Sequence, residues 1–253
     1  MKSKKYDVPT ITKAINIIDY VKKKKEASLN EILSDLGYAK STTYQILQTL
    51  RRHDVLSRTD SGKYRLGMKC FTWGHAISRN IDIRRVSHDI LRELAVTTGV
   101  SAHLAIRIGE TRATFVEKID GALYTVHNTV IGEDIVWQCS ACGKVLFAWA
   151  DEESQKNILK TISYKPYTQN SVLCEEDFLK SISLAKDRGY ALDAMEWTDN
   201  VYGVGVPVFD HKGNAIAAIS CAILASELHR KEIEEYVKNL NEASSKITRK
   251  LGG

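Results

Sequence analysis

The chain has 253 residues, 43% of them hydrophobic, which is enough for two domains that each bury a core. Its net charge of +5 is unevenly spread: residues 1–65 hold 14 Lys or Arg against 7 Asp or Glu, whereas residues 66–253 hold 22 against 24. A basic first part on a nearly neutral remainder indicates that only the first part meets a polyanion.

Secreted, membrane-spanning and disulfide-stapled proteins are excluded by the same composition. Residues 1–5 are basic but no apolar run follows them, so they do not form a signal peptide. The longest weakly apolar run, residues 215–225, is too short to span a bilayer. The cysteines number five and are scattered, which does not suit a disulfide framework. We therefore expect a soluble, cytoplasmic protein.

Two helices are predicted before residue 37. Residues 10–21 carry an apolar stripe at helical spacing, formed by Ile11, Ala14, Ile15, Ile18 and Val21. Residues 28–36 follow with a capping box, in which Ser28 is the N-cap and Glu31 stands at the third helical position. Gly37 ends this helix, because glycine is favoured just past a helix end.

A third helix, residues 41–52, is predicted to have two different faces. Its inward face carries Thr43, Ile46, Leu47 and Leu50, and its outward face carries Thr42, Gln45, Gln48, Thr49 and Arg52. The outward set is long, polar and free of acid, as the recognition helix of a helix-turn-helix requires. Glutamine can pair with adenine, and threonine can contact a thymine methyl group or a phosphate. These residues alone also fit an ordinary solvated helix face.

A predicted hairpin over residues 53–66 favours the DNA-binding interpretation. Two short apolar-alternating runs flank a turn that contains Asp60 and Gly62, and a hairpin directly after a recognition helix is a wing. The run KSTTYQILQTLRRHDVLSR, followed by GKYRLG, resembles the winged helix-turn-helix of IclR-type transcription regulators. The resemblance and the pattern together predict DNA contacts from Lys40, Ser41, Thr42, Thr43, Gln45, Gln48, Thr49, Arg52, Arg58, Lys63 and Arg65. Family members usually have arginine where Gln45 stands, so their base preference does not carry over.

The remainder of the chain predicts an α+β domain with an antiparallel sheet, because strands with hairpin-like turns alternate with helices. Helices are expected over residues 68–83, 83–98, 140–149, 152–161, 175–188 and 226–251, the last capped by Ser226. Strands are expected over residues 101–108, 114–119, 123–127, 190–195, 202–209 and 215–222. This divides the chain into a winged helix-turn-helix domain (1–66), a linker and dimerisation helix (67–82) and a second domain (83–253).

Three further motifs resemble the IclR family: SACGK at 140–144, DRGYALD at 187–193, and VPVFD at 206–210 with the strand that ends at Ser220. The resemblance implies a GAF-like domain that binds a small effector, often a carboxylate, and changes DNA affinity. The implied ligand-binding positions are Gly143, Asp193, Gly203, Ser220 and Ala222. Family members often have cysteine at position 203 and serine at position 222. The smaller residues here predict a roomier pocket and a larger ligand.

Other classes of function remain open on the residues alone. Cys139 and Cys142 form a CxxC, which could be redox-active or half of a zinc site, but no second ligand pair accompanies them. Cys142 or Cys221 could be a nucleophile with His103 or His127 as its base, yet no nucleophile elbow, P-loop or dinucleotide motif is present. A metabolite-binding module with vestigial DNA affinity is a third class. We expect no enzyme, cofactor or metal.

The combined prediction is a repressor of a catabolic operon. One recognition helix reads too few bases alone, so the unit is at least a dimer on an inverted-repeat operator. A small organic or sugar acid in the second domain would control operator affinity, and linkage requires DNA to change effector affinity by the same factor.

Overall fold

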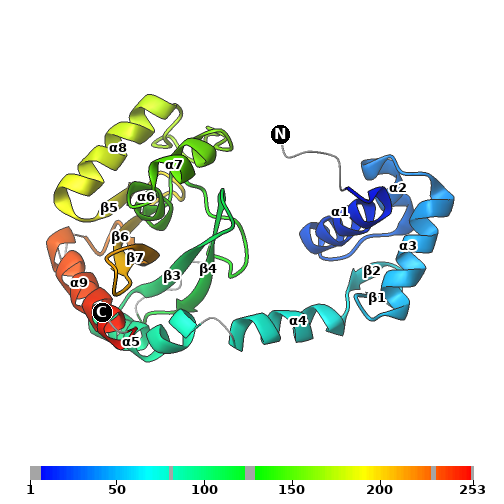
Figure 1. The fold of residues 1–253 in the computed structure, drawn as a ribbon, viewed down its shortest axis with the longest axis horizontal. Helices are drawn as coiled ribbons and strands as arrows, with labels where there is room; N and C mark the ends of the chain where they lie inside the picture. The colour runs from blue at the N-terminus through cyan, green and yellow to red at the C-terminus, as the bar shows by residue number, and fades with distance from the viewer. Residues whose placement is uncertain (1–6, 80–81, 123–128, 229–231, 252–253) are drawn as a thin grey trace. The chain divides into compact units, whose positions relative to one another are not determined.

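A computed structural model describes residues 7–79, 82–122, 129–228 and 232–251. The chain divides into two compact units, Met1–Asn80 and Ile81–Gly253, each with its own apolar core. Figure 1 shows the elements of each unit.

The first unit is a winged helix-turn-helix, as predicted. Its elements are α1 (Pro9–Lys24), α2 (Leu29–Leu36), α3 (Lys40–Arg52), β1 (Leu56–Arg58), β2 (Tyr64–Leu66) and α4 (Met68–Arg79). Helix α2 begins with the expected capping box, in which the Ser28 hydroxyl accepts the Glu31 N–H and the Glu31 carboxylate accepts the Ser28 N–H. It ends at Gly37, whose left-handed φ of 67° suits glycine. The side chains of Ile17, Ile32 and Leu47 are fully buried between the three helices.

The wing is a two-stranded hairpin that is joined to the segment before α2. The antiparallel pair of β1 and β2 brings Leu56 opposite Leu66, and Ala27, just before α2, adds an isolated bridge to Tyr64. After β2 the chain passes so close to Asp54 that a Cβ on Gly67 would lie 2.1 Å from the Asp54 carbonyl oxygen. A glycine is therefore required where the wing leads into α4.

The second unit is an antiparallel sheet with helices on both faces, which confirms the predicted α+β class. Its elements are α5 (Asp82–Thr98), β3 (Ser101–Ile108), β4 (Arg112–Ile119), α6 (Ala141–Ala148), α7 (Glu152–Leu159), α8 (Glu175–Arg188), β5 (Ala191–Ala194), β6 (Val201–Phe209), β7 (Ala215–Leu224) and α9 (Ile233–Lys250). The strand order is β4-β3-β7-β6-β5, and every neighbouring pair is antiparallel.

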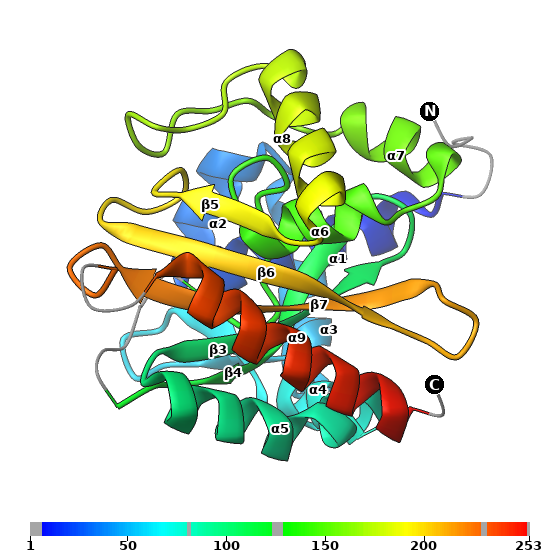
Figure 2. The ribbon, with the colours of Figure 1, turned by 90° about the vertical axis from the view of Figure 1, so that its left-hand side faces the viewer.

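The two faces of this sheet bury different cores. Helices α5 and α9 pack on one face, where Leu91, Leu240 and Val206 are fully buried. Helices α6 and α8 cover the other face, with Val145 and Phe178 fully buried (Figures 1 and 2). The period-two alternation of the strands produces this division, because successive side chains point to opposite faces.

The start of the last helix differs from the prediction. Helix α9 begins at Ile233 after an N-cap at Glu232, and Ser226 lies in a turn instead of capping a helix. Strand β7 continues to Leu224, which pairs with Val201, and the next N–H bonds to the Asn200 carbonyl. The Glu227 N–H then bonds to the Leu224 carbonyl, so the chain leaves the sheet in a turn where the helix was expected to begin. The strand expected over residues 123–127 lies outside the described residues.

No helix within the described residues is both long and apolar enough to cross a bilayer.

We expect Ser28→Ala to lower the free energy of unfolding of the first unit by about 1 kcal/mol, because the Glu31 N–H loses its acceptor at the start of α2. Urea denaturation followed by circular dichroism measures this loss. Ser28→Asp, which keeps a capping oxygen, is the matched control and should stay near the wild type. An equal loss in both variants would contradict the capping role.

Candidate functional site

The outward face of α3 is available to a partner. Gln45, Thr49 and Arg52 are exposed, Thr42 and Gln48 are half-buried, and Lys40 and Ser41 are exposed at the start of the helix. The predicted DNA contact from Thr43 is wrong, because its side chain is fully buried and its hydroxyl donates to the Ala39 carbonyl. The helical period places it with the inward residues, and it supports α3 from below.

The basic residues of the wing differ in how they are held. Arg58 and Arg65 are exposed, and their Nε atoms donate within the hairpin, to the Gly62 carbonyl at 2.9 Å and to the Ser57 hydroxyl at 3.2 Å. The Lys63 ammonium lies 2.8 Å from Glu26, and this contact raises the pKa of Lys63. Lys63 therefore forms an ion pair within its own unit. The described contacts of Arg58 are instead to a backbone carbonyl and to the Tyr64 ring, and neither neutralises its charge.

The second unit contains a small, partly open cavity of about 40 Å³ between the sheet, the start of α6 and the loop after β5. Four of the five predicted ligand positions line it: Asp193, Gly203, Ser220 and Ala222. Asp193, Gly203 and Ala222 are direct cross-strand neighbours on β5, β6 and β7, so one row of the sheet brings them together. Sequence reasoning missed several further lining residues, which are His103, Phe115, Thr129, Ser140, Ala141, Trp197, Thr198, Val201 and Cys221.

Gly143 does not line the cavity. Its N–H donates to the Ser140 hydroxyl, which caps α6, and a Cβ at this position would lie 2.9 Å from the Trp137 backbone. Close packing against Trp137 therefore accounts for this glycine. The part of α6 that does reach the cavity is its first turn, through Ser140 and Ala141.

The cavity is narrower than the sequence predicts. The small residue at position 203 does not open space, because a Cβ there would lie 3.1 Å from the Cβ of Asp193 and 3.3 Å from that of Ala141. Asp193 on β5 and Ala141 on α6 thus occupy the space that a side chain at position 203 would need. The rings of Phe115 and Trp197 stack beside the cavity with centroids 6.2 Å apart.

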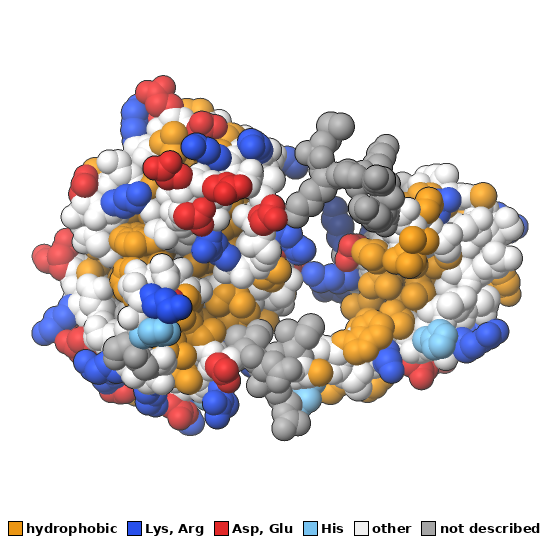
Figure 3. All heavy atoms as spheres, in the orientation of Figure 1, with side chains coloured by type: hydrophobic (Ala, Val, Ile, Leu, Met, Phe, Trp, Pro, Cys, Tyr) orange, Lys and Arg blue, Asp and Glu red, His pale blue; other side chains and the backbone are white. Residues whose placement is uncertain are grey.

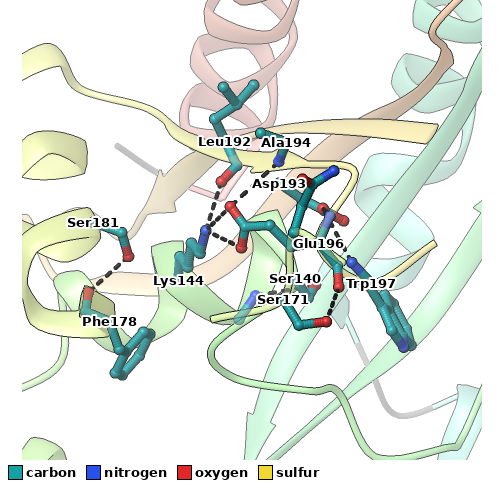
Figure 4. Close-up of polar contacts among 12 residues, drawn as sticks. Ser140, Lys144, Ser171, Phe178, Ser181, Leu192, Asp193, Ala194, Glu196 and Trp197 are labelled. Atoms are coloured by element: carbon teal, nitrogen blue, oxygen red, sulfur yellow. Dashed lines mark hydrogen bonds and ion pairs between the residues drawn. The ribbon is translucent and has the colours of Figure 1, made fainter. Parts of the chain in front are cut away.

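Asp193 is buried at the cavity wall and holds the loop that follows β5. Its Oδ1 accepts the Glu196 N–H at 2.7 Å and the Trp197 N–H at 3.4 Å (Figure 4). Burial raises the pKa of Asp193 to about 7, since the charged form loses its hydration there. At neutral pH this carboxyl group can therefore donate as well as accept a hydrogen bond.

A buried ion pair fixes the same loop from the other side. The Lys144 ammonium, on α6, lies 2.6 and 2.7 Å from the two Glu196 carboxylate oxygens and 2.8 Å from the Leu192 carbonyl. Figure 4 shows Lys144 reaching from α6 to these acceptors. Lys144 is 1% exposed, so both charges are largely removed from water. The sequence signal for this pair is a lone lysine inside an apolar eight-residue helix, ACGKVLFA.

The cysteines of the CxxC are poorly suited to redox or zinc chemistry. Burial raises the pKa of Cys139 to about 11 and that of Cys142 to about 12, whereas the thiolate is the form that attacks and binds metal. The Cys142 thiol donates to the Ser220 hydroxyl at 3.2 Å and so links α6 to β7. The described residues contain no cluster of three or more His, Cys, Asp or Glu that could hold a metal ion. His127, a candidate base, lies outside them.

A winged helix-turn-helix followed by an α+β unit with a small cavity is the architecture of a class of DNA-binding transcription regulators. Comparison with known proteins identifies the family. Residues 10–60 match the IclR helix-turn-helix domain, and residues 75–249 match the bacterial transcriptional regulator IclR C-terminal domain. The chain belongs to the IclR family of transcription regulators, so it is a regulator and not an enzyme.

Individual relatives match this chain along nearly its whole length. The HTH-type transcriptional regulator XynR of Escherichia coli (strain K12) is 32% identical over 247 residues, which is 97% of this chain and 98% of that protein. The HTH-type transcriptional repressor AllR of the same strain is 24% identical and covers 96% of this chain and 90% of its own. The crystal structure of an IclR regulator from Alicyclobacillus acidocaldarius superposes with a TM-score of 0.82 at 26% identity and covers 97% of this chain and 100% of its own.

We expect Lys144→Met to destabilise the second unit by about 3–5 kcal/mol, because it leaves the Glu196 carboxylate buried without its cation. Thermal or urea unfolding measures the loss. Lys144→Met combined with Glu196→Leu should recover most of it, since neither charge then remains. Lys180→Met, which removes an exposed ion pair to Glu176, is the matched control and should change little. No recovery in the double variant would contradict the account.

Proposed function

We propose that the protein is a dimeric or tetrameric repressor of a catabolic operon, released from an inverted-repeat operator by a small organic or sugar acid. One observation carries the proposal: the same chain combines an acid-free outward face on α3 with a second unit whose cavity is lined by hydrogen-bonding groups. That AllR, a relative, is named a repressor supports repression. A regulator whose partner is the bacterial chromosome acts in the cytoplasm.

The chemistry of α3 supports base reading by its middle and phosphate contact at its ends. Gln45 and Thr49 project from the exposed face, and glutamine can bond adenine through two atoms. Lys40, Arg52 and Arg58 would meet the backbone, where positive charge releases bound counterions. A single helix of this length reads only a few bases, so two copies related by two-fold symmetry are needed.

Exposed apolar side chains on the first unit support self-association. Ile11 and Ile15 on α1, and Met68, Phe71 and Trp73 on α4, are between 51% and 70% exposed. Figure 3 shows apolar side chains gathered on this unit, whereas charged side chains of both signs are scattered over the second. Exposed apolar patches on a soluble unit mark interaction sites. Ile11 and Ile15 line one groove with Gln45 and Thr49, so a second copy would cover α4 and leave that groove to DNA.

A carboxylate effector would have to be held without a cationic side chain. No lysine or arginine lines the described part of the cavity, and Lys144 is occupied by Glu196. The first turn of α6 supplies the alternative, because the helix dipole favours an anion there, although the Gly143 N–H already donates to the Ser140 hydroxyl. Asp193 and Ser220 are available to hydroxyl groups of the same ligand. A cavity of about 40 Å³ must widen to admit it, and this widening would be the conformational signal.

The linker helix would carry this signal. Helix α4 directly precedes the second unit in the chain, so a change of shape around the cavity would bias the relative placement of the two recognition helices. The effector would then lower operator affinity, and operator DNA would lower effector affinity by the same factor.

A thermal-shift screen tests the proposed function. The full-length protein is heated with pyruvate, D-gluconate, D-galacturonate, benzoate and 4-hydroxybenzoate, and each stabilising acid is added to a protein–operator complex. We expect at least one acid to raise the melting temperature and release the operator. Stabilisation without release would remove the regulatory role, and no stabilisation by any acid would remove this effector class.

We predict that Gln45→Ala costs about 1–3 kcal/mol of binding free energy at one base position per half-site, because its amide can bond a base edge through two atoms. Arg58→Ala should instead weaken binding to all sequences alike and lower the slope of log K against log salt by about one. Gel-shift titrations on a set of single-base operator variants measure both. A uniform loss from Gln45→Ala would remove it from base readout.

We predict that Asp193→Asn leaves operator binding intact and abolishes operator release by the effector. Asparagine keeps an oxygen for the Glu196 and Trp197 N–H groups, so the loop stays in place. Its NH₂ group replaces the second carboxyl oxygen and cannot accept a hydrogen bond from a hydroxyl group of the effector. Fluorescence anisotropy on a labelled operator, with and without the stabilising acid, measures the response. A preserved response would assign Asp193 to the loop and not to the ligand.

A further inference from the structure

A histidine at the cavity wall has no part in the proposed function so far. His103 lies on β3, is 2% exposed, and faces Ser220 as its direct partner on β7. Among the described residues, nothing hydrogen-bonds its Nε2, which is closed to solvent. A buried nitrogen without a partner costs free energy and is rare in native proteins. Because this unpaired nitrogen lies at a cavity wall, a ligand in the cavity is a candidate for its missing hydrogen-bond partner.

The chemistry of this imidazole selects its partner. Burial lowers the pKa of His103 to about 3, and the nearby Lys118, which pairs with Asp120 at 3.2 Å, acts in the same direction. The ring is thus neutral, and Nε2 is either an N–H donor or a lone-pair acceptor. A carboxylate could only accept from it and would gain no charge attraction. A hydroxyl group can donate or accept, so it suits either tautomer.

The position of the ring ties it to any widening of the cavity. His103 and Phe115 have centroids 5.5 Å apart, and Phe115 stacks on Trp197, so the three rings form one continuous wall. An acid of six or seven carbons is larger than a cavity of about 40 Å³ and must displace part of this wall. Movement at Trp197 would change the packing of Phe115 and so open a path to His103.

We propose that His103 recognises a hydroxyl group of the effector, which supplies Nε2 with its hydrogen bond once the cavity has opened. The inference rests on the proposed function, since it needs an effector in this cavity. It narrows that effector to hydroxylated acids. Ser220, opposite His103 in the sheet, and Asp193, one row along, are the hydroxyl-binding groups on the same face.

Calorimetric titration of the full-length protein with matched pairs of acids tests the proposal. The pairs are 4-hydroxybenzoate with benzoate and D-gluconate with hexanoate. We expect His103→Phe, which keeps a flat ring, to bind the hydroxylated acid about tenfold or more weakly and its counterpart unchanged. His103→Gln, which returns a polar atom near the position of Nε2, should recover part of the affinity. Equal losses for both members of a pair, or none, would overturn the proposal.

Melting temperatures without ligand supply an independent arm. We expect His103→Phe to melt at or above the wild type, because it removes an unpaired buried nitrogen. Ser87→Ala is the matched control: the Ser87 hydroxyl on α5 is also buried without a partner among the described residues, but it is outside the cavity lining. It should keep both stability and probe affinity.

The titrations and the melting temperatures together distinguish a failure of the proposed effector class from a failure of the role proposed for His103. If no acid binds the wild type, the effector class of the proposed function fails, and melting alone judges His103. A melting temperature several degrees below the wild type in both His103→Phe and His103→Gln would show that the imidazole serves the fold, and this would overturn the inference.

Discussion

The ion pair between Lys144 and Glu196 holds the wall of the cavity in the second unit. It joins α6 to the loop after β5, two segments that no strand pairing connects, and the Leu192 carbonyl completes the shell of the ammonium. Removing both charges from water is costly, and three acceptor contacts to the ammonium, at 2.6–2.8 Å, offset that cost. With the loop held this way, Asp193 and Trp197 stay at the cavity wall.

Two further contacts hold α6 against the sheet at the edge of the cavity. Glycines at positions 203 and 205 let the start of α6 rest directly on β6, where added Cβ atoms would lie 3.3 Å from the Cβ of Ala141. The Cys142 thiol bonds Ser220 on the neighbouring strand. Under the proposed function, a ligand that enters would have to loosen one of these contacts, and this would couple ligand binding to a change of shape. A regulator needs such coupling more than it needs a spacious pocket.

Most elements could be predicted from the sequence because local patterns specify them. The 3.6-residue stripe of α1, the Ser28 capping box and the left-handed Gly37 and Gly189 mark helix positions directly. The start of α9 could not, since Ser226 lies in a turn that the Glu227 N–H closes on the Leu224 carbonyl, and a serine suits such a turn as well as a helix N-cap.

The cavity was harder to predict than the fold. The resemblance to the IclR family indicated Asp193, Gly203, Ser220 and Ala222, which do line it, whereas Gly143 serves packing. Lys144 and Glu196 are 52 residues apart, and nothing local announces their pairing. The cavity is small because Asp193 and Ala141 pack against Gly203. The small size of the residue at position 203 does not by itself predict this packing.

The central claim is that the basic first unit reads a two-fold symmetric DNA sequence under the control of the second unit. Selection of bound duplexes from a random-sequence library by the full-length protein, at moderate salt and followed by sequencing, tests it most directly. The account predicts enrichment of an inverted repeat, which an effector acid then depletes. Recovery of unenriched random sequence, with and without metabolites, would contradict it.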